Sequence, residues 1–76
     1  MNTIQLECFI AVAEHLNFSR ASEELKITQP AVSHQIQTLE EELGVKLFKR
    51  TSKSVSLTSE GIQFLPDAEL ILKTAF

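Results

Sequence analysis

Apolar residues recur at intervals of three and four positions through most of this chain, which is the spacing of one face of an α-helix. The pattern predicts helices over residues 3–15, 18–25, 29–43 and 59–76. Between the last two helices, apolar and polar residues alternate instead, which favours short β-strands. The sequence therefore predicts a mainly helical domain with one small hairpin.

The second and third predicted helices are separated by a very short turn. Leu25 ends the first helix of the pair, and Lys26 is the link. Ile27 and Thr28 then fit a hydrophobic residue followed by an N-cap, with Ile27 placed to pack against Val32 inside the next helix. Two short helices joined in this way make a helix-turn-helix.

The spacing of the third predicted helix separates a buried face from an outward one. Its buried stripe consists of Val32, Ile36, Leu39 and Leu43. On its first two turns, Gln29 and Ser33 flank this stripe, and the opposite side carries Pro30, His34 and Gln37. An amide can donate to and accept from a base edge, a hydroxyl pairs with either type of base, and a proline ring can meet a thymine methyl group. The outward face is therefore suited to reading base edges.

Alternation in the segment after this helix predicts a β-hairpin. Val45 and Leu47 before the turn, and Val55 and Leu57 after it, alternate with polar residues. The four residues 51–54, Thr-Ser-Lys-Ser, are typical of a turn. We interpret this hairpin, over about residues 46–57, as a wing beside the helix-turn-helix.

The last predicted helix carries more apolar surface than a small core needs. Thr58 fits as its N-cap, and Pro66 is expected to bend it. One apolar stripe consists of Phe64, Ala68, Ile71 and Ala75, and a neighbouring stripe consists of Ile62, Leu65, Leu72 and Phe76. We expect the surplus surface to pair with a second copy of the chain; the alternative is that both stripes pack within one molecule.

Charge is distributed unevenly along the chain. The 76 residues have a formal net charge of −3, whereas a compact DNA-binding domain is usually basic. However, residues 25–39 and 43–59 contain no carboxylate, and the second segment holds four of the seven basic residues, namely Lys46, Lys49, Arg50 and Lys53. Because the local field governs docking, an acid-free face can meet DNA despite the net charge. The alternative interpretation of these four residues is an ordinary solvated hairpin.

Three consecutive glutamates, Glu40 to Glu42, stand at the end of the third helix, where the helix dipole disfavours negative charge. Arg20 and Arg50 are the available cations, and we expect one of them to pair with Glu40. Gly44 follows at the position that favours a left-handed backbone.

The sequence contains no catalytic or metal-ligating constellation, so we expect neither an enzyme nor a cofactor or metal. Ser33 and His34 are adjacent, and a helix points adjacent side chains in different directions. Cys8 is the single cysteine and fits a small buried hydrophobic residue, and His15 has no spacing partner. With no membrane-length apolar run and no signal peptide, the expected location is the cytoplasm.

The sequence resembles the N-terminal winged helix-turn-helix domain of LysR-type transcriptional regulators over nearly all of its length. The matching positions are Leu6, Phe9, Asn17 to Ala21, Thr28 to Ser33, Gln35, Ile36, Leu39, Glu40, Leu43, Gly44, Leu47, Phe48, Arg50, Leu57, Thr58 and Gly61. The resemblance implies a mainly α winged helix-turn-helix fold, with a DNA-binding domain over residues 1–58 and a linker and dimerisation helix over residues 59–76. Family members continue into an effector-binding domain, so we expect this chain to be a DNA-binding fragment.

The resemblance also implies sequence-specific binding of double-stranded DNA by a homodimer, on an interrupted inverted repeat in the bacterial nucleoid. The recognition helix, about residues 29–43, would enter the major groove, while the wing would lie on the backbone or in the minor groove. Expected DNA contacts come from Thr28, Gln29, Pro30, Ser33, His34, Gln37, Arg50 and Lys53, and expected dimer contacts from Ile62, Leu65, Leu72 and Phe76. A small-molecule effector is expected only in the absent domain.

Two positions depart from the family pattern. His34 stands where relatives most often carry arginine, and the tip of the wing lacks the glycine that many relatives have. The resemblance implies that Lys53 makes the wing contact and that Arg50 meets a phosphate or an internal carboxylate. These departures and the net acidity leave a second hypothesis open, in which the chain is a winged-helix module for protein interaction or dimerisation without sequence-specific DNA binding.

Overall fold

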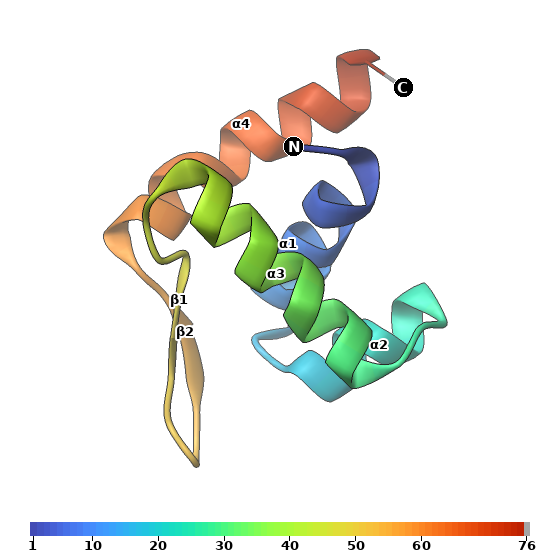
Figure 1. The fold of residues 1–76 in the computed structure, drawn as a ribbon, viewed down its shortest axis with the longest axis vertical. Helices are drawn as coiled ribbons and strands as arrows, with labels where there is room; N and C mark the ends of the chain where they lie inside the picture. The colour runs from blue at the N-terminus through green and yellow to red at the C-terminus, as the bar shows by residue number, and fades with distance from the viewer. Residues whose placement is uncertain (76) are drawn as a thin grey trace.

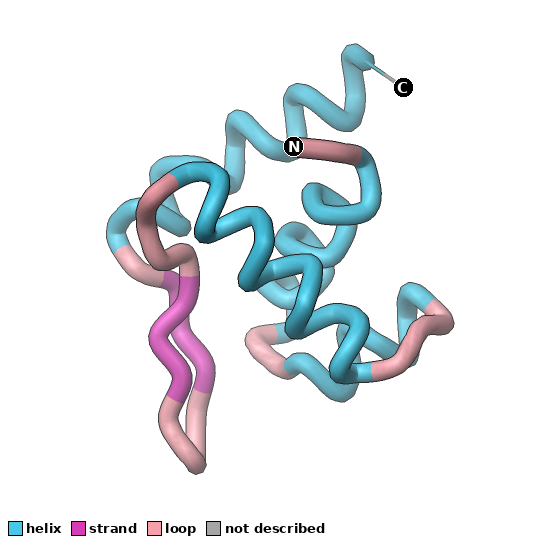
Figure 2. The backbone as a smooth tube through the Cα atoms, in the orientation of Figure 1, coloured by secondary structure: helices cyan, strands magenta, loops and turns pink. Residues whose placement is uncertain are grey.

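The computed structural model describes residues 1–75 and has the expected winged helix-turn-helix architecture. Along the chain lie α1 (Thr3–His15), α2 (Phe18–Leu25), α3 (Gln29–Leu43), β1 (Phe48–Arg50), β2 (Val55–Leu57) and α4 (Ser59–Ala75). Figure 1 shows α3 crossing the front of the molecule, with the hairpin extending downward and α4 along the top. Figure 2 shows that the loops are short connections between these elements.

Side-chain caps explain where the first three helices begin. At α1, the Asn2 side chain accepts a hydrogen bond from the Gln5 backbone N–H at 2.8 Å, and the Asn2 N–H donates to the Gln5 side chain at 2.9 Å. Asn17 caps α2 and Thr28 caps α3 with their side-chain oxygens. Gly44 ends α3 in the left-handed conformation, with a φ of 73°. The predicted ends of the recognition helix are therefore confirmed.

The core joins α1 to the other helices and to the base of the wing. Phe9 is fully buried, and its ring centre lies 5.5 Å from that of Phe48 in β1 and 5.4 Å from that of Phe64 in α4. The buried stripe of α3 is formed by Val32, Ile36 and Leu39, as predicted. Leu43 was expected to extend this stripe but is 37% exposed, because it is the last residue of α3 before the chain turns away.

The strands of the wing are shorter than the alternation predicted. They pair antiparallel, with Phe48 opposite Leu57 and Arg50 opposite Val55. The predicted hairpin is confirmed, but its first strand does not include Val45, because the consecutive residues Leu47 and Phe48 are both buried where the wing joins the core. The first strand therefore begins only at Phe48.

The turn of the wing closes without glycine. The Thr51 N–H donates to the Ser54 carbonyl oxygen at 2.9 Å, and the Thr51 hydroxyl oxygen accepts from the Ser54 N–H at 3.0 Å. Within residues 1–75, the non-glycine residues with positive φ are Leu16 and Lys26, so no wing residue adopts the conformation that glycine favours. The missing glycine is therefore compatible with a closed wing.

Glu40 is compensated by backbone N–H groups and not by arginine. Its Oε2 accepts hydrogen bonds from the Leu47 N–H at 2.7 Å and the Phe48 N–H at 3.4 Å. The ammonium of Lys46 lies 3.9 Å from Oε1. The expected pairing of Glu40 with Arg20 or Arg50 is therefore wrong. The folded chain instead uses this carboxylate to hold the start of the wing against α3.

Glu42, the last of the three glutamates, anchors the start of the chain. Its carboxylate lies 2.6 Å from the N-terminal ammonium and accepts from the Gln5 amide at 2.9 Å. The hydrogen bond from the N-terminal ammonium, followed by that from Gln5, lowers the pKa of Glu42 below its ordinary value.

The last helix is capped as predicted and packs only one side on the core. The Thr58 hydroxyl oxygen accepts from the Gly61 N–H at 3.0 Å, and its O–H donates to the Lys46 carbonyl oxygen at 2.6 Å. Ala68 is fully buried, and a surrounding set is half-buried, namely Phe64, Leu65, Ile71 and Leu72. Ile62 and Leu70 are 62% and 59% exposed, and Phe76 lies outside the described residues.

Candidate nucleic-acid interface

The first two turns of α3 expose the polar face that the sequence predicted. The solvent-exposed side chains are Thr28, Gln29, Pro30, His34 and Gln37, and Ser33 is half-buried among them. The Thr28 hydroxyl oxygen accepts a hydrogen bond from the Ala31 N–H at 3.3 Å, so Thr28 caps the start of the helix. The outward positions therefore carry hydrogen-bonding groups and one proline ring.

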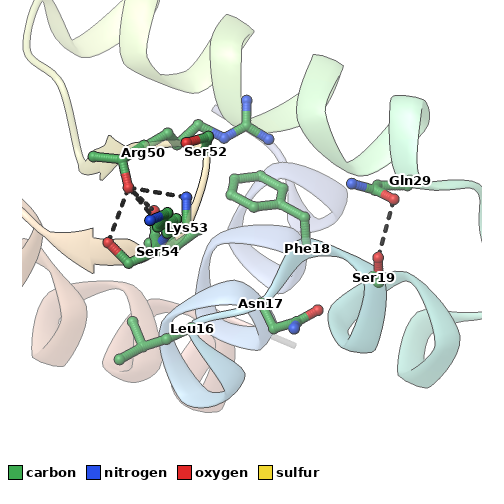
Figure 3. A pocket seen from close by; sticks show the side chains of 11 residues that line it. Leu16, Asn17, Phe18, Ser19, Gln29, Arg50, Ser52, Lys53 and Ser54 are labelled. Carbon is green, nitrogen blue, oxygen red and sulfur yellow. Dashed lines mark hydrogen bonds between the residues drawn. The ribbon is translucent and has the colours of Figure 1, made fainter.

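A groove separates this face from the wing. It is lined by residues 16–19 at the α1–α2 junction, by Gln29 of α3 and by wing residues 50–55. Figure 3 shows Gln29 and Arg50 on opposite sides of this groove, with the Phe18 ring between them. The lining contains the cations Arg50 and Lys53 and no carboxylate. A second groove runs between α3 and the base of the wing, past Ser33 and Gln37. Its charged lining residues are Arg50, Lys46 and Glu40.

Arg50 joins the wing to both helices of the helix-turn-helix. Its guanidinium carbon lies 3.6 Å from the centre of the Phe18 ring of α2, and its Nη2 donates to Ser33 Oγ of α3 at 2.9 Å. A guanidinium on an aromatic face gains about 0.5 to 1 kcal/mol at an exposed site. Within residues 1–75 this arginine has no carboxylate partner, so the expectation of an internal ion pair is wrong.

Gln29 is held by a residue that the sequence did not identify. Ser19 Oγ of α2 donates to Gln29 Oε1 of α3 at 3.1 Å (Figure 3). The two residues are ten positions apart and lie on different helices, so no periodic pattern links them. Ser19 entered the sequence interpretation only as part of the family resemblance.

The basic residues of the wing remain available to a negatively charged partner. Lys49 and Lys53 are exposed, and the Lys46 side chain is 77% exposed despite its distant contact with Glu40. Two carboxylates outside the wing are engaged elsewhere: Glu24 lies 2.6 Å from His15, and Glu42 lies against the N-terminus. The wing therefore presents exposed cations beside the first turns of α3.

The two histidines and the single cysteine lie in different surroundings. His34 is exposed on the outward face and has no hydrogen-bond partner among residues 1–75. His15 contacts Glu24 and ties α1 to α2. Burial, and then the charge of Glu7, raises the pKa of Cys8 to about 11, so this thiol is a buried core group, as predicted.

No cluster of three or more histidine, cysteine, aspartate or glutamate residues that could hold a metal occurs within the described chain. None of the helices in residues 1–75 has the length and apolar character that crossing a lipid bilayer requires.

Comparison with known proteins adds independent information on this surface. Residues 4–62 match the family model described as bacterial regulatory helix-turn-helix protein, lysR family. The chain is 53% identical over 66 residues to the glycine cleavage system transcriptional activator of Escherichia coli K12, covering 87% of this chain and 22% of that protein. It is 52% identical over 67 residues to the uncharacterized HTH-type transcriptional regulator YnfL of the same strain, covering 88% of this chain and 23% of that protein. The chain thus spans less than a quarter of the length of either regulator.

Solved structures agree with this assignment. The DNA-binding domain of CbnR in complex with DNA superposes with a TM-score of 0.95 at 44% identity, covering 99% of this chain and 86% of that one. The BenM DNA-binding domain in complex with catB site 1 DNA gives a TM-score of 0.92 at 43% identity, covering 99% and 84%. From the matched family model and these relatives, the chain belongs to the LysR family of bacterial regulatory helix-turn-helix proteins.

Proposed function

We propose that this chain is the DNA-binding part of a transcription regulator and that α3 reads a specific double-stranded sequence. The observation that carries the proposal is the juxtaposition of the polar outward face of α3 with a basic wing, across a groove that has no carboxylate in its lining. The CbnR and BenM structures, which this fold closely matches, are titled as DNA complexes, and this supports the same partner here. Because the relatives are transcription regulators, no enzymatic activity is part of the proposal.

In this proposal α3 enters the major groove and the wing lies against the adjacent backbone or minor groove. Gln29 and Ser33 read base edges, Pro30 meets a thymine methyl group, and His34 and Gln37 contact bases or phosphates farther along the helix. Lys53 and Arg50 add positive charge from the wing, and Thr28 holds the start of α3 near the backbone. Residues 1–58 form this DNA-binding unit.

We further propose that residues 59–76 pair two copies of the chain, so that two recognition helices meet an interrupted inverted repeat. The support is the exposure of Ile62 beside the half-buried Leu65 and Leu72, with Leu70 as an additional exposed residue that the sequence did not identify. Covering such an apolar surface with a partner lowers the free energy of the pair. A small-molecule effector would bind the remainder of a longer regulator. The regulator itself would act in the bacterial cytoplasm, at the nucleoid.

The proposed DNA binding is tested by selection from a pool of random duplexes, followed by gel shifts at low and moderate salt. Gln29→Ala should cost roughly 1 to 3 kcal/mol on the selected sequence while sparing non-specific duplexes. Lys53→Ala should weaken binding to all duplexes and reduce the slope of log affinity against log salt by about one. Lys73→Ala removes the same charge from α4 and is the matched control, with a smaller effect on the slope.

The outcome separates the two hypotheses for this chain. Enrichment of a sequence motif supports a regulator that reads DNA. Absence of selective binding at both salt concentrations supports the alternative, a winged-helix module for protein interaction.

Pairing through α4 is tested by sedimentation. Ile62→Glu should shift the chain from dimer to monomer and keep its helical circular dichroism, because this side chain is largely outside the core. Gln63→Glu adds the same charge at a neighbouring exposed position and serves as the control. Equal affinity of the wild-type chain for a half-site and a full inverted repeat would contradict dimeric recognition.

A further inference from the structure

The two side chains of α3 best placed to read bases are each held through their acceptor oxygen. Ser33 Oγ accepts a hydrogen bond from Arg50 Nη2 at 2.9 Å, and Gln29 Oε1 accepts from Ser19 Oγ at 3.1 Å. The holding residues come from two different elements, the wing and α2. Each contact therefore uses one of the two lone pairs through which the side chain would otherwise accept from DNA.

The direction of the first contact follows from the chemistry of arginine. A guanidinium has only donor groups, so Ser33 has to be the acceptor in this pair. The hydroxyl proton of Ser33 has no partner among residues 1–75, which leaves it free to donate. A hydroxyl that already accepts from a cation is polarised toward donation, and the nearby positive charge repels a second donor. Ser33 is therefore presented as a donor.

Gln29 is also presented as a donor, in this case by the neutral side chain of Ser19. Its carbonyl oxygen faces Ser19, and its amide NH₂ group has no protein partner in the described chain. Figure 3 shows the amide nitrogen of Gln29 directed away from Ser19. Gln29 and Ser33 are four positions apart on one helix, so the two donor groups lie one turn apart on the same side.

Arg50 itself is fixed in place rather than free to reach elsewhere. Its guanidinium carbon lies 3.6 Å above the Phe18 ring, and β1 holds its backbone opposite Val55. A planar group stacked on a ring loses little additional freedom when it forms a directed hydrogen bond. The wing thus sets the hydrogen-bonding state of a residue on α3.

We propose that Arg50 and Ser19 are positioning residues that fix the hydrogen-bonding polarity of the recognition helix, so that Ser33 and Gln29 enter the DNA groove as donors. The inference rests on the proposed DNA-binding function. Donors pair with the acceptors of the major groove, which are guanine O6 and N7, adenine N7 and thymine O4. They do not pair with the amino groups of cytosine and adenine. The bases facing Ser33 and Gln29 are therefore selected for their acceptor atoms.

The test compares variants on one duplex selected by the wild-type chain and on a matched set of duplexes with single base changes. Ser19→Ala and Arg50→Met each release one acceptor oxygen, and Met keeps an apolar stem beside Phe18. Discrimination against the base change that presents an amino group should fall about three- to tenfold in each variant, the worth of one hydrogen bond. The change should occur at different base positions for the two variants.

A double-mutant comparison separates positioning from a direct phosphate contact. Ser33→Ala removes the hydroxyl, so adding Arg50→Met to this background should leave discrimination at that base unchanged. If Arg50 acted only on phosphate, its replacement would lower affinity for all duplexes equally and reduce the salt slope by about one, with discrimination intact. Circular dichroism of each variant checks that the fold is retained.

Some outcomes would overturn this inference alone, and one would overturn the proposed function. Unchanged base discrimination in both Ser19→Ala and Arg50→Met, while the wild-type chain still binds selectively, contradicts fixed polarity. Retention of full affinity when purine N7, guanine O6 and thymine O4 are all removed at the facing bases also contradicts it. Failure of the wild-type chain to select any sequence would instead contradict DNA reading itself.

Discussion

Gly61 lies in the first turn of α4, where it packs against the base of the wing. A Cβ added at this position would lie 2.2 Å from the Leu47 carbonyl oxygen and 2.8 Å from Cδ2 of Leu57. Carbon and oxygen normally approach no closer than about 3.3 Å, so the backbone would have to separate by about 1 Å. The same carbonyl accepts from the Thr58 N–H at 3.0 Å, so moving it also strains that hydrogen bond.

Effects of opposite sign determine how much Gly61→Ala changes the free energy of unfolding. Alanine improves helix propensity by about 1 kcal/mol over glycine. Overpacking costs about 1 to 3 kcal/mol, and loss of the hydrogen bond to the Leu47 carbonyl oxygen adds about 1 kcal/mol. We therefore expect a net loss of about 1 to 3 kcal/mol. For a domain of this size, that lowers the melting temperature by roughly 5 to 20 °C.

Thermal and urea denaturation followed by circular dichroism measure this change. Gln63→Ala, two positions along α4, is the control, because its side chain is exposed and lies outside the proposed pairing stripe, and we expect an effect within about 0.5 kcal/mol. A Gly61→Ala variant that melts at the wild-type temperature or above it would refute the tight contact between α4 and the wing.

Three further predictions concern other parts of the surface. Glu40→Ala should cost about 1 to 3 kcal/mol of stability, because it leaves the buried Leu47 N–H without its acceptor, whereas Glu41→Ala should be nearly neutral in the same denaturation assay. The backbone N–H of Glu60 and then the Ser59 hydroxyl lower the pKa of the Glu60 carboxyl, so its contribution is complete above the unfolded-state pKa of about 4.3 and is lost as pH falls through the folded-state pKa. Glu60→Gln should therefore be less stable than the wild type at neutral pH, with a difference that disappears in strong acid; a constant difference across a pH series of urea titrations would contradict this. His34→Arg should bind DNA more tightly in anisotropy titrations, because a guanidinium is always charged and can contact guanine at two points; unchanged affinity would place position 34 outside the contact surface.

Local signals in the sequence were sufficient for much of the fold. The caps at Thr28 and Thr58 and the left-handed stop at Gly44 depend on residues within a few positions of one another, and the structure places all three as expected. Leu16 and Lys26 also adopt left-handed conformations without being glycine, and no local pattern marks them.

Contacts between distant residues were not predictable in the same way. Glu40 binds the N–H groups of the wing instead of an arginine, and Arg50 stacks on Phe18 instead of meeting a carboxylate. Each of these contacts joins two separate elements. The periodicity of a single helix or strand therefore does not predict it. The sequence identified which residues face outward on α3, whereas the partners that orient Gln29 and Ser33 emerged only from the three-dimensional arrangement.

Chemical-shift mapping by NMR most directly tests the central claim, that the first turns of α3 and the wing meet DNA. The isotope-labelled domain is titrated with the duplex enriched from the random pool. We predict that the largest amide shifts fall on residues 28–37 and 50–54, while the acidic end of α3 and the outer side of α4 change little. Shifts centred on α4 or on Glu40 to Glu42, with the first turns of α3 unaffected, would contradict the account.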